Sequence, residues 1–298
     1  MKLGLRVVFM LVPATDNHIH INPVKGMGPE SIGKLFKSHG GTALFVVSLP
    51  SWSYDVSVKD PLDFERCYSL TLSSVEKLSE LGVQAFAIVG VHPAELTFML
   101  SRGTSLTEAV KLLQKGLEKA AMWVNEQRAV AIGEVGLPHY PVSDEVLNAS
   151  NQLLEYALIL AKDADCPVQL HTGHLDEGEI SSLLEVVKRI GLKPDRIIKH
   201  FAPPDTSLFS RWGLFPSVLA TEKNVAKALA SDTCFLMETD FIDDPKRPGA
   251  VLDPRSTPRT IRRLLLKGVS EDSFWKICKE NPEKIYGVEI QIKNGIKL

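Results

Sequence analysis

The 298-residue chain is 44% hydrophobic and 23% charged, the composition of a globular protein with a sizeable core. Its formal net charge of −2 gives no overall attraction to nucleic acid or to an anionic membrane. A local cluster of basic residues around an active site would still be enough to bind an anionic substrate. The four cysteines are scattered, as in proteins of a reducing compartment. No apolar run approaches the roughly 18–20 residues of a membrane span. We therefore expect a cytoplasmic protein that does not associate with membranes.

The N-terminus resembles a signal peptide because Lys2 and Arg6 precede the apolar run 7–12. That run is short and leads directly to His18 and His20, so cleavage there would remove the segment that holds both histidines. We predict a first strand here instead. Residues 1–10 are then an N-terminal extension that leads into the strand, and Met10 is an alternative start.

Apolar runs typical of buried parallel strands recur along the chain and alternate with helical stretches. The strands are predicted at 42–48, 84–91, 129–133, 167–170, 196–199, 213–218 and 234–238. The helices are predicted at 29–37, 64–81, 104–127, 144–163, 179–190, 221–231, 258–267 and 270–279. The candidate strand 213–218 contains Pro216, which is unusual in a central strand. The loop before the second helix, which contains Trp52 and Tyr54, is long enough to serve as a lid.

Eight strands with intervening helices predict an α/β fold with a parallel sheet, and the number eight favours a closed (β/α)8 TIM barrel over an open sheet. No Gly/Ser-rich linker or charge block divides the chain, so we expect one domain over residues 1–298. No glycine-rich loop or P-loop follows the first strand. The main nucleotide-binding alternatives are therefore excluded.

Metal-capable side chains follow or end the predicted strands. A His-x-His pair alone is a weak signal, but the barrel brings all strand ends to one mouth, where active sites lie. The residues concerned are His18, His20, His92, Glu134, His171, His200 and Asp240. Each histidine alone could instead have a purely structural role, with its ring hydrogen-bonded to the backbone. So many strand ends of the same kind favour a metal site.

Without His92, four imidazoles and two carboxylates exceed the needs of one tetrahedral ion. Shared by two divalent cations roughly 3.5–4 Å apart, with Glu134 between them, they leave room for a water whose pKa the cations lower. Imidazole ligands favour Zn, Mn, Fe or Ni over Mg, which prefers oxygen ligands. The sequence does not choose among these metals.

The chain resembles the TatD family of metal-dependent hydrolases, a branch of the amidohydrolase-like barrels, over nearly its whole length. The resemblance rests on the ordered motifs 16–20 (DNHIH), 90–93 (GVHP), 131–137 (AIGEVGL), 167–171 (PVQLH), 199–201 (KHF), 238–240 (ETD) and 281–287 (NPEKIYG). It implies that His18, His20 and Asp240 bind one metal, that His171 and His200 bind the other, and that Glu134 bridges both. It also implies that Asp240 accepts a proton from the attacking water and that His92 contacts the phosphate of the substrate.

Three positions depart from the family pattern. Nuclease members usually have an aspartate where this chain has Pro138, an arginine where it has Gly173, and Ser-Pro where it has Phe241-Ile242. An arginine fork is a good phosphate ligand, so its loss puts DNA cleavage in doubt while leaving the metal site intact. His174, next to Gly173, either replaces it as a donor to the substrate or caps a turn.

Several further residues have two interpretations. Asp16 and Glu238 either accept hydrogen bonds that orient the imidazoles or form structural ion pairs. Lys246, Arg247 and Arg255 either bind an anionic substrate at the rim or are solvated surface charges. Lys199 directly precedes His200 in a predicted strand, so its side chain is expected to point away from the metals. Lys199 is therefore not expected to bridge the two ions, and Glu134 is assigned that role.

The sequence leads to three functional hypotheses. The favoured one is an enzyme in which a metal-bound hydroxide cleaves a phosphoester, either of a small molecule or of a nucleic acid. The second is hydrolysis of an amide, lactone or other C–N or C–O bond at the same site. The third is a metal-free barrel that acts in binding. The oligomeric state is left open.

Overall fold

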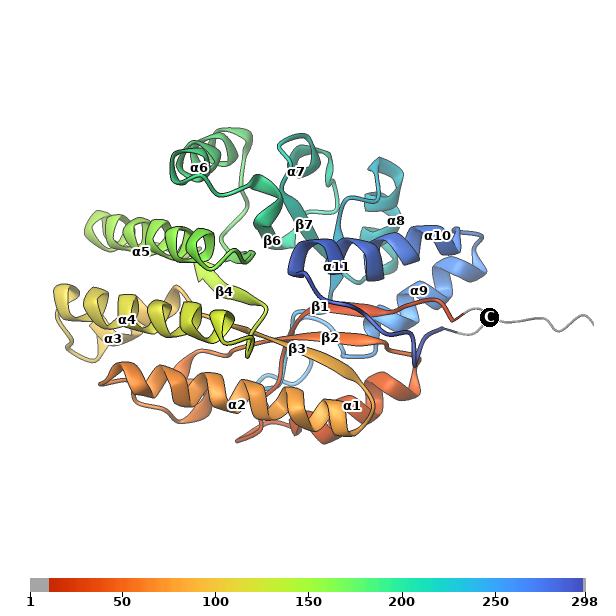
Figure 1. The fold of residues 1–298 in the computed structure, drawn as a ribbon, viewed down its shortest axis with the longest axis horizontal. Helices are drawn as coiled ribbons and strands as arrows, with labels where there is room; N and C mark the ends of the chain where they lie inside the picture. The colour runs from red at the N-terminus through yellow and green to blue at the C-terminus, as the bar shows by residue number, and fades with distance from the viewer. Residues whose placement is uncertain (1–10, 297–298) are drawn as a thin grey trace, which may run out of the picture.

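The computed structural model describes residues 11–296, and its centre is a parallel sheet that helices surround (Figure 1). The strand order is β8-β7-β6-β5-β4-β3-β2-β1-β9. The strands are β1 Thr15–His20, β2 Ala43–Val47, β3 Gln84–Val89, β4 Ala131–Gly136, β5 Val168–His171, β6 Ile197–Ala202, β7 Phe215–Leu219, β8 Leu236–Glu238 and β9 Phe241–Ile242. Apart from β1 and β9, neighbouring strands in this sheet order are successive in sequence, as in a (β/α)8 barrel.

The sheet closes on itself through its last two strands. Only Thr239 and Asp240 separate β8 from β9, yet β8 pairs with β7 while β9 pairs with β1. The backbone N–H of Asp240 donates to the carbonyl oxygen of His18 at 2.9 Å and continues this seam. The two segments together are the eighth strand of the barrel. The predicted (β/α)8 architecture is thus confirmed.

Alternation along β2 shows why the strands are apolar on both faces. Ala43, Phe45 and Val47 belong to a cluster inside the barrel, whereas Leu44 and Val46 pack outward beneath the helices. All five side chains are fully buried. Burial on both faces is the cause of the near-continuous apolar runs from which the strands were predicted.

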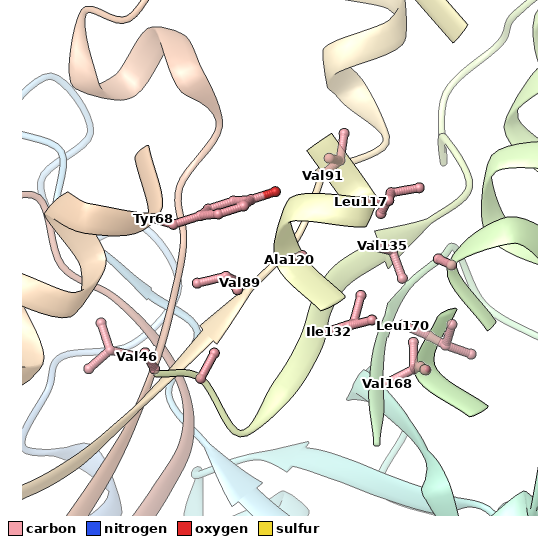
Figure 2. Packing of buried hydrophobic residues seen from close by; sticks show 14 of the residues in the cluster. Val46, Tyr68, Val89, Val91, Leu117, Ala120, Ile132, Val135, Val168 and Leu170 are labelled. Carbon is pink, nitrogen blue, oxygen red and sulfur yellow. The ribbon is translucent and has the colours of Figure 1, made fainter. Parts of the chain in front are cut away.

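The outer core lies between the strands and the surrounding helices. Figure 2 shows Val46, Val89 and Ile132 on successive strands, with Tyr68 and Leu117 from two helices packed against this layer. Ile285 and Tyr286 belong to the same cluster inside the barrel as Ala43, Phe45 and Val47. The strands are therefore packed on both faces. This packing supports their carboxyl ends, which carry the polar residues.

The helices include three short ones, at 94–101, 207–211 and 281–286, that were not predicted, and most of the others begin and end close to the predicted positions. They are α1 Gly28–Ser38, α2 Pro61–Glu80, α3 Ala94–Ser101, α4 Leu106–Asn125, α5 Asp144–Asp163, α6 Glu177–Ile190, α7 Ser207–Arg211, α8 Glu222–Ser231, α9 Ser256–Leu266, α10 Glu271–Trp275 and α11 Asn281–Tyr286. Short 3-10 helices lie at Ser51–Tyr54 (η1) and Pro194–Arg196 (η2), and a π-helical turn lies at Lys276–Glu280 (η3). Capping boxes at Ser105 and Asp176 fix the starts of α4 and α6. Among the described residues, no helix is long and apolar enough to cross a membrane.

Some predicted boundaries were wrong. The first strand begins at Thr15 instead of in the apolar run 7–12, most of which lies outside the described residues, as does the proposed extension 1–10. The strand predicted at 129–133 is Ala131–Gly136, so Glu134 lies inside it. The helix predicted at 270–279 divides into α10 and the π-helical turn η3. Pro216 lies near the start of β7, where a proline interrupts few ladder hydrogen bonds.

Candidate metal centre

The carboxyl ends of the strands surround a cavity of about 1110 Å³. Its floor contains side chains from five strands or strand ends, namely His20, Glu134, His171, His200 and Asp240. His18 lies directly beneath, fully buried. The barrel thus brings together all six residues for which the sequence predicted a metal-binding role.

One group consists of the two histidines of β1 and Asp240. The Nε2 atoms of His18 and His20 are 3.0 Å apart, and Asp240 Oδ1 lies 3.8 Å and 3.7 Å from them. Three potential ligand atoms on one side of a buried site lie within 4.8 Å of one another. This spacing is compatible with a single cation bound by two nitrogens and one oxygen.

Glu134 occupies the middle of the site. Its Oε1 lies 3.5 Å from Nε2 of His20, and its Oε2 lies 3.3 Å from Nε2 of His200 and 2.8 Å from Nδ1 of His171. The carboxylate therefore faces His20 with Oε1 and the histidines of β5 and β6 with Oε2, which also lies 3.8 Å from Nε2 of His18. A carboxylate between two groups of nitrogens has the arrangement of a bridging ligand.

Outer hydrogen bonds fix which nitrogen each β1 imidazole presents. Nδ1 of His18 lies 2.7 Å from Oε1 of Gln169, and Nδ1 of His20 lies 3.0 Å from the carbonyl oxygen of Val47. Both partners are acceptors, so each Nδ1 carries the hydrogen and each Nε2 keeps its lone pair. The two lone pairs then face each other across 3.0 Å without a hydrogen between them. A cation is the natural partner for such a pair, so the donor set fits a metal.

The same rule applies to His200. Its Nδ1 lies 3.1 Å from Oε1 of Glu238, which also accepts the backbone N–H of Phe201 at 2.7 Å. Glu238 thus orients an imidazole, which was one of its two interpretations. Asp16 acts differently, because it accepts hydrogen bonds from the backbone and hydroxyl of Thr239 and so positions the segment that carries Asp240.

Burial keeps these imidazoles neutral. Desolvation lowers the pKa of His18 to about 3 and lowers the pKa of His20 and His200 as well. Burial raises the pKa of Glu134, but its interactions with His171 and His92 outweigh this effect and hold that pKa well below its ordinary value. Burial and the charge of Glu134 raise the pKa of Asp240. Neutral imidazoles with free lone pairs are the form that metals bind.

Irregular strand geometry coincides with the site residues. Register shifts occur between Asp16 and Ile19 on β1, between Ile132 and Val135 on β4, and between Lys199 and Ala202 on β6. The three interrupted stretches contain His18, Glu134 and His200. Bulges re-aim side chains next to active sites, and here they tilt ligand-bearing residues toward one centre.

His92 differs from the six central residues. Its Nδ1 accepts the backbone N–H of Ala94 at 3.0 Å, so its hydrogen is on Nε2, which lies 3.4 Å from Oε1 of Glu134. An Nε2–H group is a donor and has no lone pair to offer a cation. The geometry is therefore that of a hydrogen-bond donor at the cavity wall, and His92 lines the cavity.

Two other histidines of the mouth have different environments. His174 lines the cavity and is exposed, and no side-chain hydrogen bond of its imidazole occurs within residues 11–296. His139, on the loop between β4 and α5, was not identified from the sequence, yet its Nδ1 lies 3.0 Å from Nε2 of His171. A single loop histidine has no periodic pattern, and only its place directly after the Glu134 motif could have drawn attention to it.

The basic residues of the rim are largely neutralised. Arg247 pairs with Asp244 at 2.9 Å, Lys25 pairs with Asp55, and Arg255 pairs with Asp253 at 2.6 Å. Buried Lys199 donates to the carbonyl oxygens of Thr172 and His200 and so ties the residue that follows β5 to β6. These contacts leave little free positive charge around the cavity.

A (β/α)8 barrel with imidazoles and carboxylates gathered at its mouth is the architecture of the metal-dependent hydrolases. Residues 15–287 match the model of the family described as TatD related DNase, and the chain belongs to this family of metal-dependent hydrolases.

Known proteins of similar sequence and structure support this placement. The chain is 40% identical over 291 residues to an uncharacterized protein of Methanocaldococcus jannaschii, a match covering 96% of this chain and 99% of the relative. It is 30% identical over 192 residues to an uncharacterized metal-dependent hydrolase of Haemophilus influenzae, over 58% of this chain and 68% of the relative. The solved structure of a TatD homolog from Escherichia coli has a TM-score of 0.60 at 20% identity, covering 94% and 100% of the two chains, which shows a shared fold.

Proposed function

We propose that this protein uses two divalent cations to hydrolyse the phosphoester of a compact substrate. The observation that carries the proposal is the position of Glu134, whose Oε1 faces Nε2 of His20 while its Oε2 faces Nε2 of His200 and Nδ1 of His171. In this assignment His18, His20 and Asp240 hold one cation. His171 and His200 hold the other, and Glu134 contacts both.

Bound cations of this kind supply Lewis acidity, which acidifies a water and stabilises negative charge on the group under attack. Asp240 is the group we assign as proton acceptor from the attacking water, since it lies between β8 and β9 at the cavity wall and retains slight exposure. The Nε2–H group of His92 points into the same space and is placed to donate to a phosphoryl oxygen of the substrate. The bulk of the barrel excludes water from all other sides.

The charge of the rim supports a compact substrate. Two of the three basic residues that line the cavity, Lys25 and Arg247, are paired with carboxylates. A nucleic-acid strand needs several unpaired cations along its backbone. A small phosphoester needs only the central site.

Hydrolysis of a lactone or another C–O or C–N bond is the second candidate. Its supporting observation is the apolar part of the cavity wall, where Phe201, Leu219 and Ile242 lie beside the polar centre. An uncharged ester or lactone ring would be accommodated by such a wall without a basic partner.

The test is a substrate panel with the metal-stripped protein reloaded with Zn²⁺ or Mn²⁺. The panel contains bis(p-nitrophenyl) phosphate, a nucleoside monophosphate, single-stranded DNA, γ-lactones and anilides, with Asp240→Ala as the control. We expect turnover of the small phosphoesters, lost in the control. Turnover of lactones alone would favour the second candidate. Absence of transition metal by elemental analysis, without a metal-induced rise in melting temperature, would favour a metal-free binding protein.

A further inference from the structure

The second nitrogen of His171 is held by another histidine of the mouth. Nδ1 of His171 lies 2.8 Å from Oε2 of Glu134, whereas its Nε2 lies 3.0 Å from Nδ1 of His139. We propose that His139 is a positioning residue, which accepts the Nε2–H of His171 and thereby frees Nδ1 of His171 to bind a cation. This inference rests on the proposed metal function.

The argument begins with the pattern of the other imidazoles. His18, His20 and His200 each direct one nitrogen to the centre and donate from the other to an acceptor of the protein. Such outer acceptors set the tautomer and the ring orientation of a metal-binding histidine. Within residues 11–296, the hydrogen-bond partner of Nε2 of His171 is Nδ1 of His139, at the position that Gln169, Val47 and Glu238 occupy for the other imidazoles.

The tautomer of His171 decides whether it can bind a cation. If His139 donated its hydrogen to Nε2, the hydrogen of neutral His171 would be on Nδ1 and would point at the Glu134 carboxylate. No lone pair would then face the centre. If Nε2–H donates to His139 instead, the lone pair of Nδ1 is directed at the centre. Cation binding and acceptance by His139 are therefore linked.

The backbone beneath the pair is rigid. Gly136 lies opposite His171 in the β4–β5 ladder with φ of +152°, and a Cβ there would lie 2.0 Å from the carbonyl oxygen of His171. The N–H of Leu137 donates to the same carbonyl oxygen at 2.9 Å. Two residues later the loop presents His139 to the ring of His171. A Cβ at Gly173 would contact Cβ of His139 at 3.6 Å, so a long side chain there would compete for this space.

The experiment measures metal affinity in the full-length, chelator-stripped protein, with Zn²⁺ titrated against a chromophoric chelator. We expect His139→Ala to weaken one of the two Zn²⁺ sites about 10–100-fold, the size of effect typical for loss of an outer partner of a ligand. His139→Phe fills the same space without an acceptor and should behave like Ala. His139→Asn restores an acceptor and should bind within about threefold of wild type, on the same scale. His174→Ala, at an exposed histidine of the same mouth, should match wild type.

The outcomes separate the inference from the proposed function. Wild-type affinity at both sites in His139→Ala and His139→Phe would overturn the role of His139 alone. Equal losses in His139→Ala and His139→Asn would also overturn it, because the acceptor would not be the cause. Weakened binding in His139→Ala with no turnover of any substrate by wild type would support the role of His139 while removing the hydrolase proposal. A wild-type protein that binds no Zn²⁺ would overturn both.

Discussion

Gln169 on β5 accepts a hydrogen bond from His18 on β1 across the interior of the barrel, with 2.7 Å between Oε1 and Nδ1. The amide nitrogen of Gln169 donates to the carbonyl oxygen of Asn17 at 2.9 Å and to the hydroxyl of Tyr286 at 2.7 Å. These two donor bonds fix which end of the amide faces His18. The orientation of a proposed metal-binding imidazole thus depends on a residue of α11, near the end of the chain.

The first prediction concerns this network. Gln169→Leu removes the acceptor of His18, so we expect metal affinity to fall about 10–100-fold. Tyr286→Phe removes one hydroxyl from the same buried network but leaves the contact between Gln169 and His18 in place. It should lower the free energy of unfolding by about 1–3 kcal/mol, with metal affinity near wild type. Chelator competition and urea denaturation measure the two quantities, and equal loss of metal affinity in both variants would contradict the assigned role.

The second prediction concerns removal of the metal. A cation that binds only the folded state stabilises it by about 2.7 kcal/mol at a concentration of 100 times Kd. We expect Zn²⁺ to raise the melting temperature of wild type and EDTA to reverse the rise. Asp240→Ala should fold, show a much smaller rise and lose turnover, because one proposed ligand is missing. His171→Ala should behave in the same way, and full activity in either variant would exclude its assigned role.

Much of the fold could be predicted because burial on both faces makes the strands apolar. The ends of these runs gave the positions of His18, Glu134 and Asp240 at one mouth, and the structure brings these side chains together. The short elements α3, α7, α11 and β9 were missed. Elements of 2–8 residues contain too few turns or alternations for a periodic signal.

The outer contacts of the site could not be read from the sequence. Gln169 lies inside a strand whose apolar pattern gave no reason to separate it from its neighbours. The register shifts that re-aim His18, Glu134 and His200 depend on pairing between strands, which local sequence does not specify. His139 became recognisable only when the structure placed its ring against His171.

The third prediction concerns pH. Glu95 on α3 is buried and accepts hydrogen bonds from the backbone and hydroxyl of Ser51 in η1, and burial raises its pKa from 4.5 to about 7. Between these values the unfolded chain releases a proton that the folded protein retains. The contribution of Glu95 therefore lowers the free energy of unfolding as pH rises from about 4.5 to 7, by up to roughly 3 kcal/mol in total. Above that range this contribution does not change further.

Glu95→Gln keeps an amide oxygen for Ser51 but cannot ionise. We expect the free energy of unfolding of this variant to exceed that of wild type by an amount that grows between pH 5 and 7. The comparison between the two proteins cancels the titration of all other groups. A difference that is constant across this range would show that Glu95 does not titrate there.

The last prediction concerns Phe201, which follows His200 in β6. Its φ is +51°, in the left-handed region that costs an ordinary residue about 1–2 kcal/mol, and 47% of its surface is exposed. Glycine avoids this cost, so we expect Phe201→Gly to be more stable than Phe201→Ala by about 1 kcal/mol in urea denaturation. This order is the reverse of the usual one, because glycine within a strand normally makes a protein less stable than alanine does, by about 0.5–1 kcal/mol. Ala202→Gly, at the next residue, is the control and should destabilise the protein. If Phe201→Ala were the more stable of the two, the backbone strain at Phe201 would be disproved.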